Sequence, residues 1–133
     1  MNQSVTADEL CFHAEWVAAQ DEQYTPEFVV HGIYFGEGDP EQGGQHWNFT
    51  RSLDDDDGVC TVKEIQQVTA YGGIISFVLT RQSLVCEFDD ATAQIATTRR
   101  LVITYDINEE TWQKLVVQAK HVFDGETYFK IVN

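Results

Sequence analysis

The sequence predicts an α+β domain, a mainly antiparallel β-sheet with one C-terminal amphipathic helix packed on it. Most of the chain alternates apolar and polar residues with period two, and a single segment near the C-terminus has helical spacing instead. The 133 residues, 43% hydrophobic and 23% charged, match one ordinary globular domain. We therefore predict a single domain over residues 1–133, with residues 1–9 as a loose N-terminal segment.

Segments rich in aromatic and β-branched residues are predicted to form the strands. In CFHAEWVAA and the residue before it, Leu10, Phe12, Ala14 and Trp16 fall on one face, and Phe12 and Trp16 are predicted to belong to the core. Glycines between residues 36 and 44 and at 72–73 indicate loops and turns. The predicted strands are CFHAEWVAA, EFVVHGIYFG, QHWNFTRS, VCTVKEI, GIISFVLT, SLVCEFD, RLVITYDI and TYFKIV, the last within 127–132.

The segment NEETWQKLVVQAKHVFDG is predicted to be the helix. Asn108 is a suitable N-cap and Gly125 a suitable C-terminal stop. With no second long helix available, the apolar stripe must lie on a face of the sheet. That stripe consists of Trp112, Leu115, Val116, Ala119, Val122 and Phe123. The shorter piece DDATAQIATT is predicted to form one short helical turn.

Cysteines and histidines show no catalytic or metal-binding spacing. Cys11, Cys60 and Cys86 are interpreted as small apolar side chains in or near strands, kept reduced. His13 and His31 are predicted on neighbouring strands, without a metal. The chain contains no nucleophile elbow, P-loop or dinucleotide motif. We therefore predict a protein that is not an enzyme and uses no cofactor.

The negative charge is concentrated in the first half of the chain. The formal net charge is −14, and residues 1–60 contain 13 acidic residues against one basic residue. Such a distribution repels nucleic acid and anionic membranes and accelerates encounters with basic partners. Solubility alone is the competing explanation. The N-terminus has no basic start or apolar run, and the apolar stretches are too short to span a bilayer, so a cytoplasmic location is expected.

The run LDDDDGVCTVKE partly matches a calcium-binding loop. With Gly58 at position six, Asp55, Asp57 and Glu64 fall at positions three, five and twelve, but position one is Leu53, which has no side-chain oxygen. The flanks are predicted strands rather than the helices that an EF-hand requires. A solvated hairpin turn with its tip at residues 57–58 is the preferred interpretation, and a weak calcium site is the alternative.

The order of these segments resembles the immunity protein 10 family of bacterial polymorphic toxin systems. The resemblance runs from Phe12 to Gly125 and is strongest at YGGI and in the C-terminal helix. Where family members carry a leucine-rich strand ending in glutamine-arginine, this chain has WNFTR. The resemblance implies a small cytoplasmic protein that binds and neutralises a cognate toxin, without chemistry of its own.

A surface for this partner is predicted around the acidic segments. If the toxin is a basic nuclease, the aspartate run could act as a phosphate mimic. Two alternatives are open for Trp47, this surface and the core, and the core is preferred because aromatic residues dominate protein cores. The predicted partner-binding residues are Glu37, Asp39, Glu41, Trp47, Asp54, Asp55, Asp56 and Asp57.

Two alternatives remain open at this level. One is a small sensory or scaffold module that binds a ligand or calcium. The other concerns assembly, because an uncovered sheet edge or apolar sheet face is suited to forming a homodimer.

Overall fold

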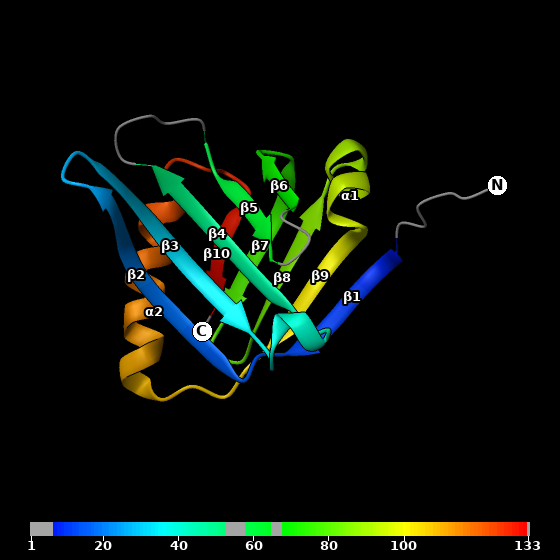
Figure 1. Ribbon diagram of the computed structural model, residues 1–133, viewed down its shortest axis with the longest axis horizontal. Helices are drawn as coiled ribbons and strands as arrows, with labels where there is room; N and C mark the ends of the chain where they lie inside the picture. Colours follow the sequence, from blue (N-terminus) through cyan, green and yellow to red (C-terminus); the bar gives the residue numbers. More distant parts are fainter. Residues whose placement is uncertain (1–6, 53–57, 65–67, 133) are drawn as a thin grey trace.

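Ten strands form two five-stranded sheets that pack face to face, as seen in a computed structural model that describes residues 7–52, 58–64 and 68–132 (Figure 1). Sheet A has the order β1 (Ala7–His13), β9 (Thr98–Thr104), β8 (Ser83–Phe88), β7 (Ile74–Thr80), β10 (Phe129–Val132). Sheet B has the order β2 (Trp16–Thr25), β3 (Phe28–Gly36), β4 (His46–Ser52), β5 (Cys60–Lys63), β6 (Val68–Tyr71). Two α-helices, α1 (Asp90–Ala96) and α2 (Glu109–Val122), and a short 3-10 helix, η1 (Pro40–Gln42), complete this part of the chain.

The predicted α+β class is therefore confirmed, with one correction. Sheet B is antiparallel throughout, whereas β1 pairs with β9 and β10 pairs with β7 in parallel, so the pairing is mainly antiparallel. The strands form two sheets rather than one. Period two predicts that a segment is a strand, but it does not predict which sheet the strand joins, because that depends on pairing between distant segments.

The core lies between the two sheets, where alternate residues of each strand point inward. Ile33 and Phe35 of β3 and Trp47 and Phe49 of β4 are fully buried on the inner face of sheet B. Opposite them, the inner face of sheet A contributes the buried side chains Phe12, Phe77, Leu79, Leu84, Cys86, Phe88, Leu101 and Ile103. Burial of these apolar surfaces supplies most of the driving force for folding.

Helix α2 packs on the inner face of sheet B against β2, β3 and β4, beside sheet A (Figure 1). Its predicted stripe faces the core, where Leu115, Ala119 and Val122 are fully buried. Asn108 is the N-cap, as predicted, and its side chain accepts a hydrogen bond from the backbone N–H of Thr111. The helix ends at Val122, earlier than the predicted stop at Gly125, and Gly125 instead adopts a φ of +80° in the following turn.

The first predicted strand is in fact two strands in different sheets. The backbone N–H of Ala14 donates to Thr104 O in sheet A, and the next N–H, of Glu15, donates to Gly36 O in sheet B. Because the chain crosses between sheets here, the alternation that buries Phe12 and Ala14 does not continue to Trp16. Trp16 is 42% exposed, so the prediction that it belongs to the core is wrong.

The remaining predicted elements are present, with shifted ends. Strand β1 begins at Ala7, so Ala7–Glu9 belong to sheet A rather than to a loose segment. Strand β6 was not predicted, because VTAY is short and contains a single strongly apolar residue. The short helical turn is α1, which begins after Asp89, whose side chain accepts a hydrogen bond from the Thr92 N–H.

The turn between β6 and β7 supports α1. Gly72 and Gly73 both have positive φ, at +71° and +81°, as predicted for a glycine turn. A Cβ on Gly73 would lie 1.7 Å from Thr92 Oγ1, whereas a Cβ on Gly72 would meet nothing within 4 Å. The first turn of α1 therefore rests directly on Gly73.

These two neighbouring glycines allow a matched test of the contact. We expect Gly72→Ala to lower the free energy of unfolding by about 1 kcal/mol, since it adds only backbone strain. Gly73→Ala adds the clash with Thr92 and should cost about 2–4 kcal/mol. Urea denaturation followed by circular dichroism measures both values. Equal costs would contradict the proposed packing of α1 on the turn.

Candidate functional site

The outer face of sheet B is hollowed and presents a mixture of aromatic and acidic side chains to solvent. Register places the outward residues in rows across the strands, with Trp16 opposite Gly36 and Gly36 opposite His46. In the next row, Ala18 pairs with Tyr34, which pairs with Asn48. The hollow has a volume of about 310 Å³ and is lined by Trp16, Ala18, Gln20, Glu22, Tyr34, His46, Asn48 and Glu64.

Two glycines of β3 allow aromatic rings to lie directly against the backbone on this face. A Cβ on Gly36 would lie 2.3 Å from Trp16 Cζ2, and a Cβ on Gly32 would lie 2.2 Å from Tyr34 Oη. The ring atoms thus occupy the space that side chains would fill at these positions. Glycine inside a strand commonly marks such a close approach. The spacing of Gly32 and Gly36, four residues apart on one strand and hence on one face, was the signal in the sequence that could have revealed this feature.

The glycine-rich acidic loop between β3 and β4 is hydrogen-bonded to the end of this face at which Trp16 lies. Gly38 N–H donates to Glu15 Oε1 at 2.8 Å, and His46 Nε2 donates to Gly38 O at 3.1 Å. The His46 ring also meets the Trp16 ring edge-on, with centroids 5.1 Å apart. Inside the loop, Asp39 Oδ1 accepts the Glu41 N–H at the start of a short 3-10 helix, Pro40–Gln42. The loop therefore extends the outer face of sheet B beyond Trp16.

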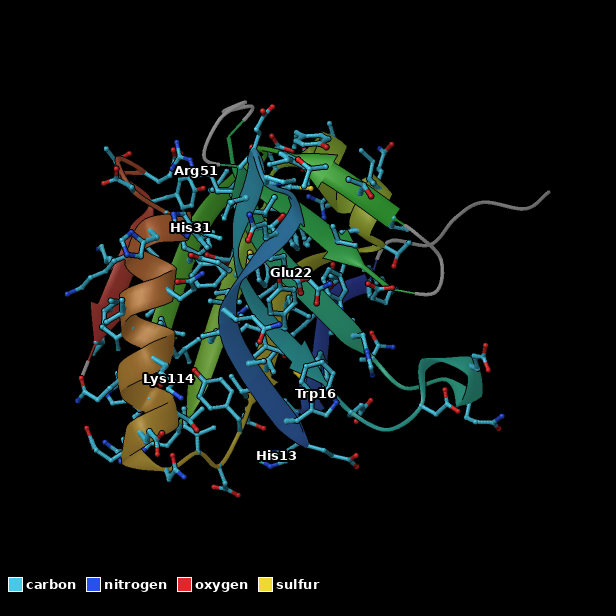
Figure 2. The ribbon with its side chains drawn as sticks, turned by 60° about the vertical axis from the view of Figure 1, so that its left-hand side comes forward. His13, Trp16, Glu22, His31, Arg51 and Lys114 are labelled. Carbon is cyan, nitrogen blue, oxygen red and sulfur yellow. The ribbon has the colours of Figure 1, made fainter. Side chains whose placement is uncertain are left out.

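Within the described strands of sheet B, the carboxylates on this face have no lysine or arginine beside them. The described strands of sheet B contain two basic residues, Arg51 and Lys63. Arg51 Nη1 donates to the carbonyl oxygens of Val122 and Asp124, at 3.2 and 2.6 Å, at the C-terminal end of α2. Both basic side chains thus occupy inward positions, in the rows of His31 and Trp47. Figure 2 shows Arg51 near the C-terminal end of α2 and Glu22 on β2.

Lys63 is held inside by an aromatic ring and a hydroxyl. Its Nζ lies 5.5 Å from the centroid of the Trp47 ring and donates to Thr97 Oγ1 at 3.2 Å. Burial lowers the pKa of the Lys63 ammonium from its ordinary value. Trp47 itself is 0% exposed, and its Nε1 donates to Gln45 Oε1 at 3.1 Å.

The predicted partner-binding residues are thereby separated into three groups. Glu37, Asp39 and Glu41 do lie together, in the loop beside the outer face of sheet B. Trp47 lies on the opposite face of sheet B and is fully buried. It therefore belongs to the core and is not part of the candidate surface. Asp54, Asp55, Asp56 and Asp57 lie outside the described residues.

Two of the three side chains in the calcium alternative belong to the same segment, which lies outside the described residues. Asp55 and Asp57 are among them, while Glu64 follows β5 and its Oε1 accepts a hydrogen bond from Asn48 Nδ2 at 3.3 Å. The flanking segments are strands β4 and β5, as predicted, and not EF-hand helices. Within the described ranges, no group of three or more His, Cys, Asp and Glu side chains could hold a metal ion.

A polar cluster attaches α2 to the inner face of sheet B. Asp21 Oδ1 is 2.6 Å from His31 Nδ1 and accepts a 2.6 Å hydrogen bond from Gln118 Nε2. The His31 ring stacks on His121, with centroids 4.7 Å apart. His31 therefore pairs with α2 and β2. The prediction that His13 lies on a neighbouring strand is wrong, because β1 and β3 belong to different sheets.

The three cysteines lie in strands, as predicted, and none forms a disulfide. Cys60 and Cys86 are buried, and burial raises the pKa of both thiols. Cys11 is exposed, and its thiol pKa is also raised, mainly by desolvation and by the hydrogen bond to Glu9. Raised pKa values keep the thiols protonated and poorly nucleophilic at neutral pH.

A second hollowed region lies around the β7–β8 turn. It comprises two neighbouring hollows of about 430 and 460 Å³ that share Arg81 and Gln82. Arg81 is paired with Glu109, and the Tyr105 hydroxyl donates to Thr80 O at 2.6 Å. Since these polar groups are satisfied inside the protein, this region is the weaker candidate for binding.

Neither helix in the described part of the chain has the length and apolarity needed to cross a membrane. Searches against protein-family models, curated proteins and solved structures each returned no match. The resemblance to immunity proteins therefore stays a prediction.

The Asp21 cluster predicts a pH dependence of stability. The Gln118 hydrogen bond, followed by that of His31, lowers the pKa of Asp21 below its ordinary value of 3.8. Folding thus favours the carboxylate, and this stabilisation is complete above pH 3.8 and is lost as the pH falls through the folded value. We expect Asp21→Asn to lower the free energy of unfolding at pH 7 by about 1 kcal/mol, a value reduced because the carboxylate is half exposed.

Urea denaturation between pH 2 and 7 checks this expectation, with the difference from wild type shrinking toward the acid end. Asp106→Asn is the control, because Asp106 is 97% exposed and its ion pair with His13 is long, at 3.7 Å. Its cost at pH 7 should be close to zero. A difference for Asp21→Asn that does not change with pH would contradict the role of the charge.

Proposed function

We propose that this protein is an immunity protein, which binds a cognate bacterial toxin domain in the cytoplasm and neutralises it without chemistry. The observation that carries the proposal is the charge of the outer face of sheet B. Glu22 and Glu64 flank the hollow there, Glu37 lies in the attached loop, and the basic residues of the sheet point inward. An open acidic face of this kind is complementary to a basic protein surface.

A toxin domain that acts on nucleic acid would fit this face. Such a domain needs a basic cleft to bind phosphates. An acidic inhibitor can approach that cleft quickly, since long-range attraction raises the association rate, and it blocks the substrate once bound. Exposed aromatic side chains, Trp16 foremost, suit the centre of such an interface, because Trp and Tyr are enriched among interface hot spots.

Growth rescue tests the proposal directly. The toxin domain encoded beside the gene is expressed in bacteria with and without this protein, and survival is followed. Rescue together with a complex that co-purifies at a one-to-one ratio is the expected result. Absence of both would overturn the immunity function and favour the ligand- or calcium-binding module, which calcium-dependent thermal unfolding would then reveal.

The charge of the outer face should control the association rate. We expect the triple variant Glu22→Gln, Glu37→Gln, Glu64→Gln to associate with the toxin domain about tenfold more slowly at low salt, with a weaker dependence on salt. Stopped-flow fluorescence at two ionic strengths measures both quantities.

The matched control for this variant removes three carboxylates elsewhere, with Asp90→Asn, Asp106→Asn and Glu110→Gln. All three residues are exposed and lie outside sheet B, in α1, in the loop after β9 and in α2. The change in net charge is the same. A general charge effect would slow both variants equally, and that outcome would contradict a role for this particular face.

A further inference from the structure

The hollow on the outer face of sheet B combines an aromatic floor with an acidic rim. The Trp16 ring occupies the space above Gly36, and the Tyr34 ring occupies the space above Gly32. An aromatic ring that packs against the backbone of a sheet can leave its other face open for stacking. Trp16 is 42% exposed, so part of its ring is accessible to a partner.

Two carboxylates on the rim are oriented by neighbouring amides. Gln20 Nε2 donates to Glu22 Oε1 at 3.4 Å, and Asn48 Nδ2 donates to Glu64 Oε1 at 3.3 Å. Each amide occupies one oxygen of its carboxylate, and within the described residues the hydrogen bonds leave Oε2 as the second acceptor. An incoming donor that lies over the rings can therefore bind a carboxylate oxygen at the rim of the hollow.

We propose that this hollow binds one arginine side chain of the basic partner. A guanidinium group is planar, always charged and carries five N–H donors, so it stacks on an aromatic ring and pairs with carboxylates in the same plane. A lysine ammonium provides the charge but neither the plane nor the fork of donors. The proposal rests on the proposed function for the identity of the partner as a toxin domain.

The shape of the hollow favours a side chain over a free small molecule. It lies open on a sheet surface, whereas sites for small ligands enclose most of the ligand. A side chain carried by a larger protein surface does not need such enclosure, because the surrounding interface holds it in place. The outer face of sheet B and the loop attached through Gly38 provide that surrounding area.

Titration of the isolated protein with amino-acid derivatives tests the proposal. The probe is N-acetyl-arginine amide, followed by ¹⁵N–¹H NMR at constant ionic strength. The chain has three tryptophans, and two of them, Trp47 and Trp112, are buried. The indole signal of Trp16 should shift and saturate in roughly the millimolar range, while the other two stay in place and serve as internal controls.

Two further probes separate shape from charge. N-acetyl-lysine amide should bind about threefold more weakly, since it lacks the stacking plane. N-acetyl-citrulline amide has nearly the same shape without the charge and should produce no saturable shift. Equal binding of the arginine and lysine derivatives, or equal shifts of all three indoles, would overturn the proposal.

Variants locate the binding to the hollow. Glu22→Gln combined with Glu64→Gln should weaken arginine binding at least about fivefold, whereas Glu87→Gln on the outer face of sheet A should leave it unchanged. Trp16→Leu, followed through the backbone amide of Gly36, should reduce binding to the level of the lysine derivative. Because Trp16 is exposed, this variant is expected to fold. Unchanged affinity in both hollow variants would overturn the proposal.

The titration and the growth assay fail independently. Arginine binding at Trp16 without rescue would leave the site in place and remove the immunity function. Rescue combined with no preference for arginine would keep the function and remove the arginine site.

Discussion

The contact of Phe49 with Phe77 and Phe123 is the interaction on which the rest of this structure depends. Phe49 comes from sheet B, Phe77 from sheet A and Phe123 from the residue after α2, and their ring centroids lie 4.3 to 6.3 Å apart. Phe129 of the last strand stacks on Phe123 at 4.7 Å. One aromatic cluster thus joins both sheets and the helix. Because sheet B receives both sheet A and α2 on its inner face, only its outer face remains for another protein.

The contact that holds the end of α2 on sheet B also affects the charge of the outer face of that sheet. Arg51 points inward because its guanidinium donates to the carbonyl groups of Val122, the last residue of the helix, and of Asp124, in the turn that follows. A positive charge at this end also complements the helix dipole. The other basic residue of sheet B, Lys63, is drawn inward by Trp47 and Thr97. Two contacts that stabilise the fold therefore leave the carboxylates of the outer face without a neighbouring lysine or arginine in the described strands of their sheet.

The glycines of β3 link the fold to the proposed binding site in a similar way. Within a strand, glycine costs stability, because it contributes no packing and loses more backbone entropy. Gly32 and Gly36 repay this cost by accommodating the Tyr34 and Trp16 rings against the backbone. The result is a shallow hollow lined by aromatic rings rather than a row of side chains that project into solvent. This arrangement is easier to explain by recognition than by stability, since the rings stay partly open to water.

The sequence by itself determined the fold class, most strands, both helices, the Asn108 cap and the acidic loop of Glu37, Asp39 and Glu41, because each depends on neighbours within a few residues. It placed Glu64 inside the predicted strand VCTVKEI, whereas β5 ends at Lys63. Only the tertiary structure decided that there are two sheets, that Trp47 is buried and Trp16 exposed, and that Trp16, Glu22, Tyr34 and Glu64 share one hollow. The physical reason is that period two separates the residues of a strand into two faces without specifying which face is covered. That choice is made by the contacts of distant segments, such as the crossing at Ala14–Glu15 and the docking of α2.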